Sequence, residues 1–145
     1  MPITSAVCNS FKTEVLGGIH DLDTDVIKIA LIKANETGTY GASTTNYSSV
    51  TGNSDEASGT NYSTGGNTLS GASITLDSST AIVDFSDTVW SSATISADGA
   101  LIYNSSKSNR AIAVIDFGGT VTSTAGDFTI QFPAAAAATA IIRLS

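Results

Sequence analysis

Short apolar segments recur at roughly ten-residue spacing from residue 81 to residue 145, and this pattern constrains the fold more than any other feature of the sequence. In "DFTIQF", Phe128, Ile130 and Phe132 alternate with polar residues, as in a strand with one buried face. In the last segment, "AIIRL", the same reasoning places Ile142 and Leu144 inward. Glycines separate several of the segments, where turns or bulges need them. The pattern of residues 81–145 therefore predicts a β core.

The composition agrees with a mainly β fold. Of the 145 residues, 21 are Ser and 20 are Thr, and only 13% are charged. Small hydroxyl side chains compete for backbone hydrogen bonds, and β-branched residues lose rotamer freedom in helices, so both favour strands and turns. A chain of this length is typical of one domain. We expect a single domain over residues 1–145 that forms an antiparallel β-sandwich or a small barrel.

Two further elements are predicted before residue 35. Val7, Phe11 and Val15 recur at four-residue spacing, which indicates a short helix over residues 5–17 that begins after Thr4 or at Ser5 and ends at two glycines. The next segment, "DVIKIALIKA" at residues 25–34, is apolar at both odd and even positions. Because both of its faces are apolar, it predicts a central strand.

Residues 35–80 differ sharply from the rest of the chain. Of these 46 positions, 32 are Ser, Thr, Gly or Asn. So few apolar side chains offset little of the conformational entropy lost on ordering. We therefore expect an extended arm or loop that is ordered against neighbouring molecules, with Tyr40, Tyr47 and Tyr62 as interface anchors.

The charge distribution bears on partners. The net charge is −7, and no Lys or Arg lies between Lys33 and Lys107. An acidic surface repels nucleic-acid phosphates, so we expect no nucleic-acid partner. No apolar run approaches the length of about 20 residues that spans a membrane, and no signal peptide is recognised, so we expect a soluble protein made in the cytoplasm. The single cysteine, Cys8, excludes an internal disulfide.

Three sets of residues invite a chemical interpretation, and we expect none of them to form an active or metal site. Asp21, Asp23 and Asp25 have the first spacings of a calcium loop but lack its glycine and its final glutamate, which favours a solvated turn. Cys8 and His20 would make a dyad only if they met in space; a buried thiol and a surface histidine are the commoner outcome. Carboxylate pairs for glycoside hydrolysis could come from several strand ends: Asp84, Asp87, Asp98, Asp116 and Asp127. The sequence thus predicts no catalytic residue, no cofactor and no metal.

The segment "ALIYNSSKSNRAIAVIDFGG" predicts a hairpin whose polar tip presents two cations. Apolar strands flank "NSSKSNR", which places Lys107 and Arg110 at the turn. A solvated turn is the alternative. We treat Lys107 and Arg110 as candidate interface residues, together with the three tyrosines.

Several segments together resemble a family of small virion structural proteins of tailed bacteriophages. They are "CNSFKTEVLGGIHDL", "DVIKIALIKA", "SGTNYSTGGNTLSGA", "VDFSDTVWSSATISADGALIYNSSKSNRAIAVIDFGG" and "FTIQFPAAAAATAIIRL". The resemblance covers nearly the whole chain and implies a virion setting without catalytic residues. Within that setting we expect a capsid decoration (cement) protein, a homotrimer that binds the major capsid protein on the outer surface of the shell. A tail or tail-fibre component that contacts host polysaccharide is the alternative.

Overall fold

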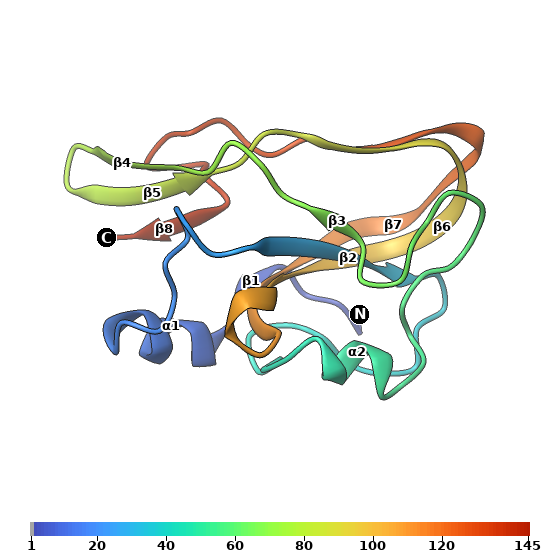
Figure 1. Cartoon of the computed structure of the whole chain (residues 1–145), viewed down its shortest axis with the longest axis horizontal. Helices are drawn as coiled ribbons and strands as arrows, with labels where there is room; N and C mark the ends of the chain where they lie inside the picture. Colours follow the sequence, from blue (N-terminus) through green and yellow to red (C-terminus); the bar gives the residue numbers. More distant parts are fainter. Residues whose placement is uncertain (1) are drawn as a thin grey trace.

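The computed structural model of the chain describes residues 2–145 and is mainly β, which confirms the predicted class. A five-stranded antiparallel sheet has the order β1-β7-β6-β2-β3, and a three-stranded antiparallel sheet has the order β4-β5-β8 (Figure 1). The larger sheet comprises β1 (Ala6–Val7), β2 (Ile27–Lys33), β3 (Asn67–Thr68), β6 (Thr88–Asn104) and β7 (Arg110–Ile130). The smaller sheet comprises β4 (Ser73–Asp77), β5 (Thr80–Asp84) and β8 (Ile142–Leu144). The helical elements are α1 (Asn9–Leu16), α2 (Ser48–Thr51) and the short 3-10 turn η1 (Ser105–Lys107).

One long hairpin dominates the larger sheet. β6 has 17 residues and β7 has 21, and they pair from Thr88↔Ile130 to Asn104↔Arg110. The prediction of short separate strands was wrong here, because the apolar segments belong to two continuous strands with irregular register between them. Glycines that read as turns lie within β7 instead, at bends and bulges of the hairpin. The hairpin is visible as the yellow and orange ribbons of Figure 1.

β2 is the central strand that the sequence predicts. It pairs with β6 on one edge and with β3 on the other. Ile29 and Leu31 on one face, and Ala30 and Ile32 on the other, are completely buried. An apolar strand buried on both faces explains why "IALI" carries no polar residue.

α1 is shorter than the sequence predicts. It begins at Asn9 and not at residue 5, because Ala6–Val7 continue as β1 and pair with Ala113 and Val114 of β7. Ser5 does not cap the helix; its hydroxyl accepts a hydrogen bond from the backbone N–H of Asp116. The first residues of the predicted helix therefore form a two-residue edge strand of the larger sheet.

Residues 35–80 form a long loop with little regular structure before β3, as expected, but they pack on their own chain. Val50, Ala57 and Leu69 are buried in the common core. Backbone bonds tie the loop to β2, for example from the N–H of Ala57 to the carbonyl of Leu31. A few apolar side chains and many backbone hydrogen bonds therefore anchor this segment on its own chain, where the sequence predicts ordering by neighbouring molecules.

Candidate functional site

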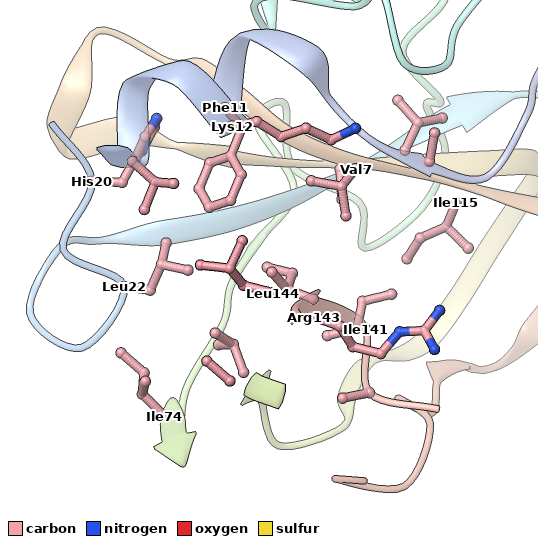
Figure 2. Close-up of a pocket in the computed structure, with 18 of the residues that line it drawn as sticks. Val7, Phe11, Lys12, His20, Leu22, Ile74, Ile115, Ile141, Arg143 and Leu144 are labelled. Atoms are coloured by element: carbon pink, nitrogen blue, oxygen red, sulfur yellow. The ribbon is translucent and has the colours of Figure 1, made fainter. Parts of the chain in front are cut away.

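An open groove of about 1040 Å³ lies between α1 and the three-stranded sheet. Its first wall comes from α1 and β1, with Val7, Phe11 and Leu16. Its second wall comes from β4, β5 and β8. Figure 2 shows Val7 and Phe11 on one side of this space, with Ile74 and Leu144 on the other. The groove is therefore the place where a face of the smaller sheet comes opposite the helix.

The face of the smaller sheet that lines the groove is entirely apolar. Strand register aligns two rows of side chains on this face: Ile74, Val83 and Ile142, and Leu76, Ala81 and Leu144. The inner part of the face is covered, but the outer aliphatic side chains are not. Leu76 is 70% exposed, Leu144 is 59% exposed and Ile74 is 51% exposed. On the facing wall Leu16 is 82% exposed.

The exposure of Leu144 corrects the prediction that it points into the core. Ile142, two residues earlier on the same face of β8, is buried as expected. Leu144 instead lines the groove, because β8 forms the edge of a sheet whose apolar face has no layer packed over its outer end. Large aliphatic side chains gathered on one surface are typical of a binding site.

Two cations lie on opposite walls of the groove. Lys12 belongs to α1 and Arg143 to β8, and in Figure 2 both side chains reach toward the same end of the groove. Nη1 of Arg143 donates hydrogen bonds to the carbonyls of Ala138 at 2.7 Å and Ala137 at 3.4 Å. These bonds hold one end of the guanidinium group in place. Within residues 2–145 neither cation forms an ion pair, whereas Lys33, Lys107 and Arg110 do.

The hairpin tip holds the two cations that the sequence places there, but both contact their own chain. Lys107 lies 3.7 Å from Asp25, and Arg110 donates to Glu14 at 3.3 Å. The Asn104 side chain accepts from the N–H of Ser106 and so shapes the tip. The tip therefore contacts α1 and the loop between α1 and β2, and only the remaining exposed part of each cation is available to another molecule.

A buried histidine lies beneath this tip. His20 bonds to Glu14 at 2.9 Å and to Asn104 at 3.0 Å, and its side chain is inaccessible to solvent. The prediction of a surface histidine was wrong, because these two polar partners satisfy both ring nitrogens. Asn104 also donates to Asp25. Although burial opposes the charged form, hydrogen bonds from Asn104 and the N–H of Asp21 lower the pKa of Asp25.

Tyr40 is not available as an interface anchor. Its side chain is buried, and its hydroxyl donates to Asp55. Burial and the hydrogen bond to Asp55 raise the pKa of Tyr40 to about 12. The tyrosine therefore closes the 35–80 loop on itself, which corrects its assignment as an intermolecular contact.

Tyr47 and Tyr62 converge on one carboxylate. Both hydroxyls donate to Glu56, which also accepts from the N–H of Gly65. Tyr47 stacks on Tyr103 with ring centroids 4.5 Å apart. The pKa of Tyr47 is raised, mainly by burial and secondly by its hydrogen bond to Glu56. These two half-buried tyrosines thus use their hydroxyl groups within the chain.

The residues considered for catalysis have separate structural partners. The Cys8 thiol donates to the carbonyl of Gly41, whereas His20 is engaged by Glu14 and Asn104. Burial and the charge of Glu14 raise the pKa of Cys8 to about 12.

Most of the carboxylates considered for glycoside hydrolysis and for a calcium loop accept hydrogen bonds from the backbone. Four of them accept hydrogen bonds from main-chain N–H groups: Asp87 from Phe132, Asp98 from Asn35, Asp116 from Gly118 and Asp127 from Ser92. Asp21 accepts a hydrogen bond from the backbone N–H of Asp23, and Asp25 accepts one from the backbone N–H of Asp21. The exceptions are Asp84, whose Oδ1 is buried without a partner within residues 2–145, and Asp23, whose side chain makes no hydrogen bond there. Across residues 2–145 no group of three or more His, Cys, Asp or Glu side chains could hold a metal ion.

Comparisons of the chain with protein-family models, with curated proteins and with solved structures found no match. None of the helices within residues 2–145 is long and apolar enough to cross a membrane.

The groove itself was not foreseen from the sequence. The useful signal was the pair Ile74 and Leu76 in "SITLD", which alternates within an otherwise polar segment and matches the alternation in "AIVDF". The exposed Leu16 and Lys12 fall on the helix that was predicted. The sequence does not indicate that the apolar face of the smaller sheet lies opposite α1. That face is completed by β8, which comes from the other end of the chain.

Proposed function

We propose that this protein is a non-enzymatic structural protein of a tailed bacteriophage virion, a decoration protein that binds the outside of the major capsid shell and stabilises it. The virion setting rests on the resemblance of the sequence to small phage structural proteins. The observation that carries a binding role is the apolar face of the smaller sheet, where Leu76 and Leu144 are open to solvent, together with the exposed Leu16 of α1 on the facing wall. A surface of this kind favours attachment to another protein.

The fold provides a pre-formed surface for such attachment. The long β6–β7 hairpin and the internally anchored 35–80 loop leave the chain folded before it meets a partner. A pre-organised subunit loses less conformational entropy on binding than a disordered arm. Binding only to the assembled shell then stabilises that shell by mass action. Homotrimerisation remains part of this proposal.

Counting copies on purified virions tests the proposal. A decoration protein is present at on the order of hundreds of copies per particle, as the symmetry of a shell requires. We expect that number by quantitative mass spectrometry, and loss of the protein from particles should lower the temperature at which the shell releases its genome. A dozen or fewer copies would assign the chain to the tail, and absence from particles would refute a virion role.

A further inference from the structure

We propose that the groove between α1 and the smaller sheet binds an extended aliphatic peptide segment that carries a carboxylate and belongs to the partner protein. This inference rests on the proposed function, because it names the surface through which the protein attaches. It concerns the groove that Figure 2 shows, and not the hairpin tip. Three properties of the groove define the occupant: its aliphatic walls, its free strand edge and its two cations.

The aliphatic side chains of both walls favour an extended aliphatic occupant over a small ligand. Exposed aliphatic side chains lie on both walls, on Leu16 of α1 and on Ile74 and Leu144 of the smaller sheet. Leu76 continues the same apolar sheet face beyond the groove, in register with Ala81 and Leu144. A molecule confined to the inner part of the groove would leave these side chains in water. A chain that runs along the groove covers them, and the gain scales with the apolar area removed from water.

The unpaired edge of β8 favours a polypeptide as the occupant. β8 pairs with β5 along one edge only, through Ile142↔Val83 to Leu144↔Ala81. Within residues 2–145 no strand pairs with its other edge. The unpaired backbone N–H and C=O groups of an edge strand form hydrogen bonds with an added strand. An acyl chain has no groups that could use this edge.

The charges select a carboxylate on that peptide. Lys12 and Arg143 flank the groove and have no ion-pair partner within residues 2–145. They are two of only six Lys and Arg residues in a chain with a net charge of −7. Charge complementarity at the rim of an apolar site orients a partner and rejects wrong ones. The same net charge opposes a second copy of the chain as the occupant, because two copies repel each other.

Peptide titration of the full chain, followed by backbone amide shifts in NMR, tests the inference. The probe is the acetylated and amidated hexapeptide VTIEVT, and its neutral counterpart is VTIQVT. We expect VTIEVT at about 1 mM to shift the amides of β8, Leu16 and β1, with a Kd about three- to ten-fold lower than that of VTIQVT at low salt. This difference should disappear at high salt.

A matched pair of variants assigns the effect to the groove. Lys12→Gln removes a rim cation from an exposed position and should abolish most of the preference for VTIEVT. Lys28→Gln is the control, because Lys28 also lacks an ion pair within residues 2–145 but does not line the groove. It should leave both affinities unchanged. Equal binding of the two peptides, no shift at 1 mM, or tighter binding of sodium decanoate to the same residues would overturn the inference.

Virions separate a failure of this inference from a failure of the proposed function. The double variant Lys12→Gln and Leu144→Ser should reduce occupancy on particles about ten-fold or more while the purified protein stays folded. Full occupancy of this variant would refute the groove as the attachment site and leave the virion role in place. Absence of the unaltered protein from particles would instead refute the virion role.

Discussion

The Tyr40 hydroxyl donates a 2.5 Å hydrogen bond to the buried carboxylate of Asp55 and joins two parts of the 35–80 loop. Asp55 also accepts from the N–H groups of Thr37 and Gly38, and Lys33 lies 3.5 Å away. Burial opposes the charge of Asp55, but these hydrogen bonds, first that from Tyr40, outweigh it and lower the pKa of the carboxyl from 3.8 to about 2. One buried carboxylate therefore ties the first residues of this polar segment to its middle, in addition to the apolar and backbone contacts of the loop.

This arrangement predicts loss of stability in acid. The folded pKa of Asp55 lies below its unfolded value, so its contribution is complete above about pH 4 and disappears as the pH falls toward 2. A shift of this size corresponds to about 2 kcal/mol. Asp55→Asn should lower the free energy of unfolding at pH 7 by about that amount and flatten its acid dependence.

Denaturant unfolding between pH 2 and pH 7 measures this effect, with Asp23→Asn as the control. Asp23 is exposed, and its side chain makes no hydrogen bond within residues 2–145. The control should behave like the unaltered protein. Equal acid dependence of the two variants would show that Asp55 does not hold the loop.

Reversing the charges of the hairpin tip should weaken the fold locally. Lys107→Glu together with Arg110→Glu places new carboxylates beside Asp25 and Glu14, where two ion pairs now exist. Both pairs are partly exposed, so we expect the free energy of unfolding to fall by only about 1 kcal/mol. Amide hydrogen exchange in α1 should accelerate.

The corresponding glutamine variant, Lys107→Gln with Arg110→Gln, separates repulsion from loss of attraction. It should destabilise the protein less than the glutamate variant does. If α1 exchanges at the same rate in all three proteins, the tip does not fix the helix. A loss of particle occupancy in the glutamate variant would then be attributable to the surface of the tip.

Gly66 should tolerate no side chain. Its φ is +77°, and an added Cβ would lie 1.8 Å from the carbonyl oxygen of Ile29 in β2. Gly66→Ala must therefore displace the loop from the central strand. Gly118 has a similar φ of +76° but no atom within 4 Å of that position, so Gly118→Ala measures the backbone strain alone, about 1 kcal/mol. Thermal unfolding should show a much larger loss for Gly66→Ala, and equal losses would contradict the close approach.

Cys8 should be chemically inert in the folded protein. Its side chain is fully buried, and burial with the nearby charge of Glu14 raises the pKa of the thiol to about 12. The reactive thiolate is therefore scarce at neutral pH. Ellman's reagent should not label the native chain at pH 8 and should label one thiol after denaturation. Rapid labelling of the native protein would show that the N-terminal region opens readily.

Local pattern predicted those parts of the fold that depend on one segment. "IALI" in β2 is apolar at every position because both faces are buried, and "DFTIQF" alternates because only one face is. The hairpin was divided into short strands because glycines such as Gly118 and Gly119 were interpreted as turns between apolar segments. In the structure these residues lie on the exposed face or at a bulge of a continuous strand.

The candidate groove depended on relationships that sequence patterns do not contain. β8 joins β5 from a position about sixty residues away in the chain, so the apolar face that includes Leu144 exists only after folding. The tyrosines were assigned to an interface because exposed aromatic anchors are common there. Their hydroxyls instead meet Asp55 and Glu56, and that complementarity within the 35–80 segment was present in the sequence but gave no periodic signal.

We propose that the protein attaches to a virion shell through the groove between α1 and the smaller sheet. A cryo-electron microscopy reconstruction of the particle would show this attachment site. We expect the chain on the outer face of the capsid, with Leu16, Leu76 and Leu144 covered by an extended segment of the capsid protein and an acidic residue of that segment beside Lys12 and Arg143. A chain on the particle with this groove open to solvent, or no density for the chain on the shell, would contradict the account.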